Sequence, residues 1–264
     1  MPGEGPVAVQ VFGARESDLA FAAAEIDRLN RREHRFVELN LNAGCPMTKV
    51  TREGAGAKLI EDPGKIGRLL KAMVDNTDLP VTLKTRLGPR PGCTNVFEIL
   101  EAAEAAGAKG IAVHARYTTQ MHGGPVHLDQ LAAVVARARI PVIGNGSVTD
   151  ATTAAAMAAT GVSAIMVGRA ALANPGIFGE LKGAGPAPDQ QQCFRRHLQY
   201  LLEFREQLVR AFPGDHIASA DGFASVKLHT HLFRYFSGRP GAAALRARLN
   251  GIRTLAEIED IDKS

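Results

Sequence analysis

Apolar and polar positions follow two alternating patterns along this chain. Segments in which every second residue is apolar are typical of half-buried strands, and longer segments with apolar residues three and four apart are typical of helices. The first pattern predicts strands at 7–13, 36–44, 80–88, 110–117, 140–148 and 163–168. The second predicts helices at 16–31, 63–74, 96–106, 128–138 and 150–159. Strands that alternate with helices predict an α/β fold of parallel βα units.

The strand pattern stops near residue 186, and only helical patterns continue, at 190–210, 222–236 and 242–251. The residues between the two regions, 183–188, are mostly glycine and proline, which is typical of a linker. We therefore predict two domains, an α/β domain over 1–182 and a helical domain over 187–264.

One face of the second predicted strand is polar. In 37–42 the apolar residues alternate with Glu38, Asn40 and Asn42, and a glycine and a proline then place Cys45 in a tight turn. A polar row in a buried strand costs free energy unless its groups bind a ligand or one another. The alternative is a structural cysteine beside amides that satisfy one another.

Polar faces recur on the next two strands, where they carry cations. Lys84 and Arg86 share a face of one strand, and His114 and Arg116 share a face of the next. Polar residues that collect at the carboxyl ends of parallel strands are typical of the active site of a barrel. The alternative is an internal salt-bridge cluster, for example Glu38 with Lys84 or Arg86.

The last two predicted strands each end in a glycine turn that opens a helix. The turns are Asn145-Gly146-Ser147 and Gly168-Arg169. Backbone N–H groups at such turns bind phosphate, and paired turns of this kind follow the last two strands of many (β/α)8 barrels. The sequence therefore predicts a phosphate site there.

Charge and cysteine content narrow the class of protein. The net charge is +4, and residues 222–256 contain six cations and no carboxylate, which favours a surface for the phosphate backbone of a nucleic acid over a merely solvated helix face. The three cysteines are far apart and match neither a disulfide framework nor a zinc site. We find neither a signal-peptide pattern nor an apolar run long enough for a membrane, and expect a cytoplasmic, monomeric protein without a metal.

Together these motifs resemble the tRNA-dihydrouridine synthase family. The resemblance rests on NAGCP at 42–46, Lys49-Val50, GAGA at 54–57, Asp62-Pro63, PVTLKTRLG at 80–88, HAR at 114–116, GNG at 144–146 and MVGR at 166–169. It runs in order from about residue 7 to residue 178 and returns at 227–248. Flavin barrels that act on free pyrimidines share the architecture but not this series.

The resemblance implies a TIM-type (β/α)8 barrel that is incomplete here, with six recognisable strands, followed by a helical domain. Family members open with one or two further βα units that carry a flavin loop. We therefore expect 1–182 to bind flavin and 187–264 to bind tRNA. Two positions depart from the family pattern, because Asn40 stands where Asp is more frequent and His122 where an aromatic residue is usual.

The resemblance also implies the chemistry. In this family NADPH reduces FMN, a hydride passes to C6 of a uridine in tRNA, and a cysteine protonates C5 to give 5,6-dihydrouridine. Cys45 matches that cysteine, and a thiol with an ordinary pKa of about 8.5 is mostly protonated near neutrality.

Further roles follow from the same match. FMN-binding positions are Gln10, Lys84, His114, Asn145, Gly146, Ser147, Gly168 and Arg169. Substrate positions are Asn42, Arg86 and Arg116, and RNA-binding positions are Lys227, Arg234, Arg239, Arg246 and Arg248. Two other functions stay open at this point: an inactive RNA-binding remnant that lacks the flavin-loop strands, and a flavin reductase of free pyrimidines.

Overall fold

The computed structural model describes residues 5–185 and 189–211, together with helical positions 244, 247–248 and 257. By its internal contacts the chain divides into two units, residues 1–148 with 152–167 and residues 149–151 with 168–264. The first unit holds the sheet, and the second holds helices.

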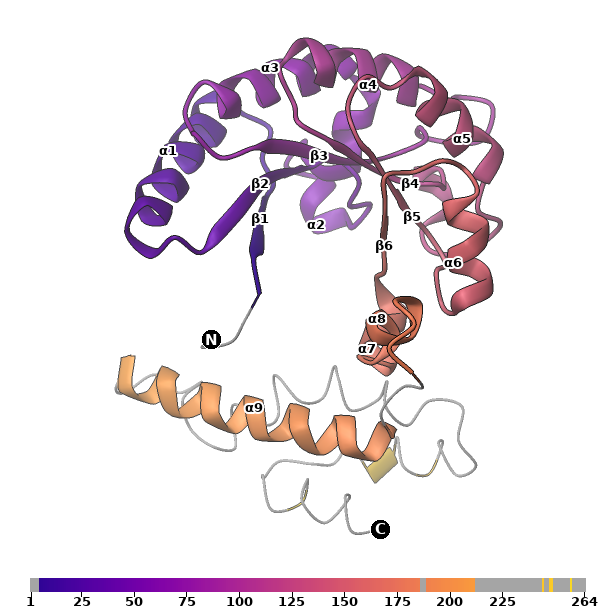
Figure 1. The fold of residues 1–264 in the computed structure, drawn as a ribbon. Coiled ribbons are helices and arrows are strands. Elements are labelled where there is room, and N and C mark those ends of the chain that lie inside the picture. The colour runs from indigo at the N-terminus through magenta and orange to yellow at the C-terminus, as the bar shows by residue number, and fades with distance from the viewer. Residues whose placement is uncertain (1–4, 186–188, 212–243, 245–246, 249–256, 258–264) are drawn as a thin grey trace. The chain divides into compact units, whose positions relative to one another are not determined.

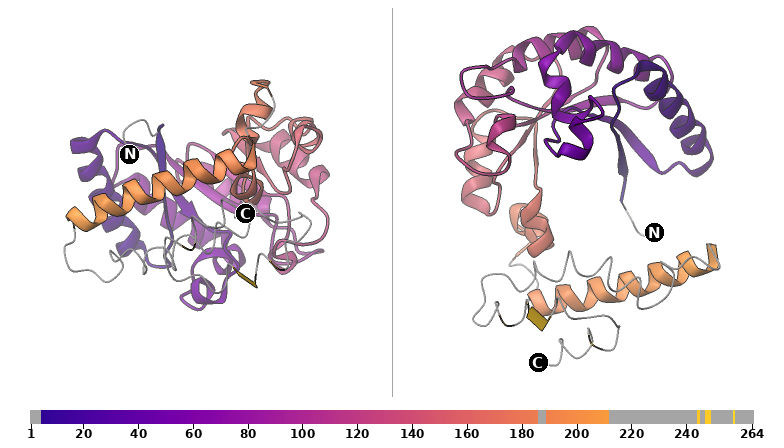
Figure 2. Two further views of the ribbon diagram at one scale, coloured as in Figure 1. Left: turned by 90° about the horizontal axis from the view of Figure 1, so that it is seen from below. Right: turned by 180° about the vertical axis from the view of Figure 1, so that it is seen from behind.

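The first unit is built on one parallel, curved sheet. Its strands are β1 (Val7–Val11), β2 (Phe36–Asn42), β3 (Val81–Arg86), β4 (Ile111–His114), β5 (Val142–Asn145) and β6 (Ala164–Met166). Their order in the sheet is their order in the chain, and every neighbouring pair is parallel. The long crossover helices lie along the outer side of the curve (Figure 1), and the view from behind shows the same arrangement (Figure 2). This is the geometry of a barrel wall.

Helices of two lengths connect these strands. The longer ones are α1 (Glu16–Glu33), α3 (Pro63–Val74), α4 (Val96–Ala105), α5 (Leu128–Arg137) and α6 (Ala151–Ala158). The shorter ones are α2 (Thr48–Thr51), η1 (Gly56–Glu61) and η2 (Thr118–Gln120). The second unit contains α7 (Arg169–Ala173), α8 (Ile177–Leu181) and α9 (Gln190–Ala211).

Helix α3 shows how the sequence specifies such a crossover. Asp62 caps its start by accepting a hydrogen bond from the backbone N–H of Lys65 at 2.9 Å, and Pro63 occupies the first turn, where no N–H is needed. Ile66, Leu70 and Met73 are fully buried at helical spacing. The cap and the apolar stripe together fix both the start of the helix and the face that packs on the sheet.

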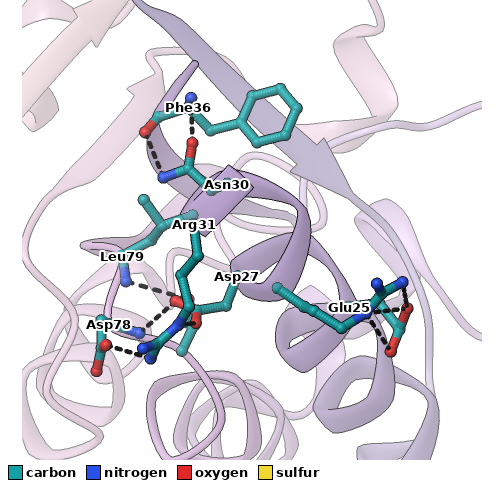
Figure 3. Close-up of polar contacts among 9 residues, drawn as sticks. Glu25, Asp27, Asn30, Arg31, Phe36, Asp78 and Leu79 are labelled. Atoms are coloured by element: carbon teal, nitrogen blue, oxygen red, sulfur yellow. Dashed lines mark hydrogen bonds and ion pairs between the residues drawn. The ribbon is translucent and has the colours of Figure 1, made fainter. Parts of the chain in front are cut away.

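The turn from α1 into β2 is held by one asparagine. The Oδ1 atom of Asn30 accepts from the backbone N–H group of Arg35 at 2.9 Å. It also accepts from the N–H of Phe36 at 2.6 Å, and Nδ2 of Asn30 donates to the carbonyl of Phe36 at 3.0 Å (Figure 3). Because His34 ends α1 in the left-handed conformation, with φ of 50°, the chain reverses there and Phe36 enters the sheet at a defined register.

A charged group fastens α1 to the loop before β3. We call Asp27, Arg31, Thr77 and Asp78 the amino-end cluster, because it lies where β2 and β3 begin. Asp27 is 8% exposed, and its carboxylate accepts from Arg31 Nε at 2.7 Å, Thr77 Oγ1 at 3.0 Å and the Asp78 N–H at 2.8 Å (Figure 3). The Arg31 hydrogen bond, followed by that of the Asp78 backbone, lowers the pKa of Asp27. The carboxylate is therefore fully satisfied by its own neighbours.

The predicted fold class is confirmed: six parallel strands alternate with helices, and every predicted strand is present, with ends up to a few residues shorter than expected. The five predicted crossover helices and the helix at 190–210 are also present. The short elements α2, η1, η2 and α8 were not predicted, whereas α7 begins at Arg169, as expected from the glycine turn after the last predicted strand. The expected helices at 222–236 and 242–251 lie outside the described residues, apart from the helical positions 244 and 247–248. Among the described helices, none is both long and apolar enough to cross a membrane.

Candidate active site

The strand register brings the polar residues of neighbouring strands side by side. Asn42 on β2 is level with Lys84 on β3. On the next pairs, Arg86 is level with His114, and His114 is level with Asn145. Residues that are 103 positions apart in the sequence, from Asn42 to Asn145, therefore lie at the same carboxyl edge of the sheet. This is the edge at which barrel enzymes carry their active sites.

The turn that carries Cys45 is fixed from three sides. The Oδ1 atom of Asn42 accepts from the backbone N–H groups of Gly44 at 3.1 Å and Cys45 at 3.0 Å. Arg86 Nε donates to the carbonyl of Gly44 at 2.7 Å, and the N–H of Ala57 donates to the carbonyl of Cys45 at 2.8 Å. Because four hydrogen bonds act on the backbone of two residues, the backbone that carries the half-buried thiol of Cys45 has a defined position.

Glycine is required where η1 approaches this turn. Gly56 has a φ of 59°, and a Cβ atom there would lie 2.6 Å from the carbonyl oxygen of Cys45. Only glycine permits both the conformation and the contact. The GAGA motif at 54–57 therefore supports the Cys45 turn from behind.

Two arginines hold the loops that surround the site. Arg86 is 2% exposed, and its Nη1 donates to the carbonyls of Tyr117 at 3.3 Å and Met121 at 2.7 Å. Arg116 is 4% exposed and donates from Nη2 to the carbonyl of Gly124 and to Ser147 Oγ, both at 2.8 Å. Buried guanidinium groups thus order the segment between β4 and α5 through carbonyls, without forming ion pairs in these contacts.

Lys84, Arg86, His114 and Arg116 form what we call the carboxyl-end cluster. Burial, followed by repulsion from Arg86, lowers the pKa of Lys84 to about 8. Burial, followed by repulsion from Arg116, lowers the pKa of Arg86 to about 10. The attraction of Cys45 opposes both shifts. Among the described residues, no carboxylate contributes to the shifts of Lys84 and Arg86, so burial and neighbouring cations outweigh the attraction of Cys45 at these two groups.

His114 is neutral in this environment. Burial, then the charges of Arg86, Lys84 and Arg116, lowers its pKa to about 3. Arg116 Nη1 lies 3.4 Å from Nε2 of His114, and because a guanidinium group only donates, Nε2 accepts and the proton is on Nδ1. The ring stacks on His122 at a centroid distance of 6.2 Å.

Hydrogen bonds of Lys84 and Gln10 connect the site to β5 and to β1. Lys84 Nζ donates to Asn145 Oδ1 at 3.1 Å, and Asn145 Nδ2 donates to the carbonyl of Met166 at 2.8 Å. On the other side, Asn42 Nδ2 donates to Gln10 Oε1 at 2.8 Å. Gln10 also lines a pocket of about 660 Å³ between the end of β1 and the start of α1. The polar groups therefore extend from β1 to β6.

Comparison with known proteins identifies the family of this chain. The family model "Dihydrouridine synthase (Dus)" matches residues 2–261. This chain belongs to the dihydrouridine synthase family. A "Probable tRNA-dihydrouridine synthase 1" of Synechocystis sp. is 30% identical over 98% of this chain and 70% of that protein. A "tRNA-dihydrouridine synthase B" of Serratia marcescens is 38% identical over 66% of this chain and 51% of that protein.

The chain spans between about half and 70% of the length of the relatives it matches. Among solved structures, a mandelate oxidase mutant with a monooxide FMN adduct matches with a TM-score of 0.43 and 22% identity, over 62% of this chain and 48% of that one. The sequence resemblance to the dihydrouridine synthase family is thus confirmed by the family model and the relatives.

Most of the site residues expected from that resemblance lie in the first unit. The structure brings together Gln10, Asn42, Cys45, Lys84, Arg86, His114, Arg116, Asn145 and Ser147 through the contacts above. Gly146, with φ of 132°, places its backbone against His114, whose ring a Cβ atom would meet at 3.2 Å. Gly168 and Arg169 belong to the second unit, so the pairing of the two glycine turns stays a prediction.

The expected RNA-binding residues are not tested by the structure. Lys227, Arg234, Arg239 and Arg246 lie outside the described residues, and Arg248 is an exposed helical residue. The division into a flavin-binding and a tRNA-binding domain also stays a prediction.

Two features of the site were not predicted from the sequence. The suggested ion pair of Glu38 with Lys84 or Arg86 is wrong for the described residues, since the Glu38 carboxylate accepts instead from the hydroxyl of Thr82. The contacts of Arg86 with Tyr117 and Met121 were also missed, because nothing in the sequence indicates that a loop bends back onto β3. Among the described residues no group of three metal-ligating side chains could hold a metal ion.

Proposed function

We propose that this chain is a flavin-dependent reductase that converts specific uridines of tRNA to 5,6-dihydrouridine, with FMN as its cofactor and NADPH as its reductant. The observation that carries the proposal is the Cys45 turn of a dihydrouridine synthase, fixed by Asn42 and Arg86 at the edge where the cations gather. The named relatives support tRNA as the substrate.

The residues present fit FMN. Its phosphate and the pyrimidine edge of its ring are rich in acceptors, and Lys84 and Arg86 supply donors whose pKa values no carboxylate of the described residues raises. Lys84, His114 and Gln10 would hold the ring, and Asn145, Gly146 and Ser147, with Gly168 and Arg169, would hold the phosphate. When bound, FMN would supply the hydride for C6 of the uracil.

The side chains of this chain have separate tasks. The turn around Cys45 holds the thiol in place as the general acid that gives a proton to C5. Lys84, positively charged below its pKa of about 8, would help to hold the flavin and would supply a positive charge to it. Neutral His114 offers a hydrogen bond without adding charge. Asn42, Arg86 and Arg116 would contact the target uridine, which must leave the tRNA stack to reach them.

The test is reduction of an unmodified tRNA transcript by the purified protein with FMN and NADPH, with dihydrouridine detected by mass spectrometry. We expect dihydrouridine in tRNA and none from free uracil or uridine. Product from free pyrimidine at a comparable rate would instead identify a free-pyrimidine reductase. Binding of tRNA without flavin binding would identify an inactive RNA-binding protein.

We place the tRNA-docking surface in the second unit. Neutralising Arg234, Arg239, Arg246 and Arg248 together should weaken tRNA binding and flatten the slope of log K against log salt, because each lost phosphate contact removes released counterions. The matched control neutralises Arg15, Arg28, Arg32 and Arg68, exposed residues of the first unit. An unchanged slope in the first variant, or an equal change in the control, would refute this placement.

A further inference from the structure

A chain of side-chain hydrogen bonds runs along the inner polar row of β1, β2 and β3. Its members are Glu38, Thr82, Asn40, Gln10 and Asn42, which we call the amide relay. The Thr82 hydroxyl bonds to Glu38 Oε1, and Asn40 Nδ2 donates to Thr82 Oγ1 at 2.7 Å. Gln10 Nε2 donates to Asn40 Oδ1 at 2.7 Å, and Asn42 Nδ2 donates to Gln10 Oε1 at 2.8 Å. The relay ends where Asn42 Oδ1 accepts from the N–H groups of Gly44 and Cys45.

Every bond of the relay points the same way. An ionised carboxylate only accepts, so the Thr82 hydroxyl must donate to Glu38 and use a lone pair to accept. The Thr82 oxygen can accept only from a donor, so it faces the Nδ2 group of Asn40. The Oδ1 atom of Asn40 is then left facing Gln10. The same logic turns the oxygen of Gln10 toward Asn42 and the oxygen of Asn42 toward the Cys45 turn. Bonds aligned in this way polarise and strengthen one another.

The carboxylate that sets this direction lies well away from the thiol. Glu38 is four residues before Asn42 on β2, which corresponds to about 13 Å along the strand. The connecting groups are largely shielded, since Asn40 is 7% exposed and Thr82 is 6% exposed. An amide that is free to flip would offer the turn an N–H group instead of an oxygen, and two backbone N–H groups would lose their acceptor.

We propose that Glu38 and Thr82 are positioning residues for Cys45: the Glu38 carboxylate fixes the direction of the amide relay, and the relay holds the acceptor oxygen of Asn42 on the Cys45 turn. The catalytic meaning of this device rests on the proposed function, in which Cys45 is the proton donor. The relay itself is a property of the protein without flavin or tRNA.

The relay also determines what Asn42 can offer a ligand. Its oxygen accepts two backbone N–H groups, and one N–H of its amide is used by Gln10. The remaining capacity of Asn42 is a single N–H donor. A substrate group that meets Asn42 must therefore be an acceptor, such as a pyrimidine carbonyl oxygen.

Backbone hydrogen exchange at Gly44 and Cys45 tests the relay in the full chain without any ligand. Thr82→Val keeps the shape of the side chain and removes the hydroxyl, so we expect exchange at both amides to become roughly fivefold faster, the factor that one ordinary hydrogen bond represents. Glu38→Gln keeps an acceptor oxygen, but its amide can also donate, so the direction of the relay hydrogen bonds is no longer fixed. This variant should give a smaller increase in the exchange rates. Thr82→Ser should restore the parental rates.

Thr77→Val is the matched control, because Thr77 also donates its hydroxyl to a carboxylate, that of Asp27. It should leave exchange at Gly44 and Cys45 unchanged, even if it lowers the melting temperature. Alkylation of Cys45, measured against Cys93 in the same molecule, should rise in Thr82→Val and not in Thr77→Val.

Parental exchange at both amides in Thr82→Val and Glu38→Gln would overturn the relay. Equal acceleration in Thr77→Val would also overturn it, because the effect would then reflect general loss of stability. A protein that makes no dihydrouridine but shows the expected exchange pattern would refute the proposed function and leave the relay standing.

Discussion

The two ends of the β2–β3 pair carry polar clusters in which the folded structure has opposite effects on the charged form of the side chains. In the amino-end cluster, the Asp27 carboxylate is matched by Arg31, by a hydroxyl and by a backbone N–H, and its pKa is lowered. In the carboxyl-end cluster, Lys84 and Arg86 have lowered pKa values because burial and other cations disfavour their charge. The folded structure therefore favours the charged form of Asp27 and disfavours the charged forms of Lys84 and Arg86.

The difference separates structural from functional polar groups. A buried ionic group that serves the fold is compensated by its neighbours. A group that keeps its charge without a compensating neighbour lowers stability, and such groups gather at functional sites. The amino-end cluster connects a helix to a loop, whereas the carboxyl-end cluster surrounds the Cys45 turn. The comparison predicts that changes at the first end affect stability and that changes at the second affect binding and rate.

The largest effect is expected at Cys45. Cys45→Ala should slow uridine reduction by roughly 10²–10⁴-fold, the loss typical of a missing general acid, while reduction of FMN by NADPH is unchanged. Stopped-flow measurement of the two half-reactions separates these steps. Cys93→Ala, which removes a half-buried thiol elsewhere in the first unit, is the control. A parental rate in Cys45→Ala would make the thiol structural.

At the amino end the effect should fall on stability alone. Asp27→Ala leaves the Thr77 hydroxyl and the Asp78 N–H without their acceptor, so we expect a loss of roughly 1–3 kcal/mol in the free energy of unfolding. Chemical denaturation measures the loss. Asp18→Ala, which breaks the exposed ion pair with Arg15, should change stability far less. A decrease in the dihydrouridine rate of folded Asp27→Ala would blur the distinction between the two ends.

The sequence predicted the fold well because strand and helix periods are local properties. The strand period alone also predicted which residues share a face, and it placed Asn42, Lys84 and His114 correctly at one edge of the sheet. It did not predict partners that depend on how a loop returns. Met121 has a φ of 53° and presents its carbonyl to Arg86, and no residue type in 117–124 indicates that path. The sequence also did not predict which side chains on one face of the sheet bond to each other, as the hydrogen bond between Glu38 and Thr82 shows.

A smaller effect, opposite in sign, is expected at Lys84. The pKa of Lys84 falls from 10.5 to about 8 on folding, so the protonated form is disfavoured in the folded state. The resulting destabilisation is complete below about pH 8 and disappears as the pH rises to 10.5. Lys84→Met should therefore raise the stability of the flavin-free protein at pH 7 by roughly 1–2 kcal/mol, while it weakens FMN binding.

The matched control for that variant is Lys71→Met, because Lys71 is an exposed lysine bonded to Asp75 on the outer helix α3. Lys71→Met should change neither the stability at pH 7 nor the affinity for FMN appreciably. Denaturation curves at pH 7 and 10.5 and a fluorescence titration with FMN provide both readouts. A less stable Lys84→Met at pH 7 would show that the positive charge is compensated after all, as it is in the amino-end cluster.

The smallest effect is expected from His114, and only in acid. Its pKa falls from 6.5 to about 3 on folding. Between pH 6.5 and 3, His114 is therefore protonated in the unfolded chain and neutral in the folded protein. The contribution of His114 is therefore complete above pH 6.5 and is lost as the pH falls toward 3. His114→Gln, which keeps a polar side chain that cannot be protonated in this range, should lose less stability than the parent between pH 6.5 and 4.5 and match its pH dependence above 6.5. Urea denaturation at half-unit pH steps measures the difference, and exposed His34, changed to Asn, is the control. Identical acid dependence in His114→Gln and the parent would mean that the folded state stabilises protonated His114 enough to offset burial and the neighbouring cations.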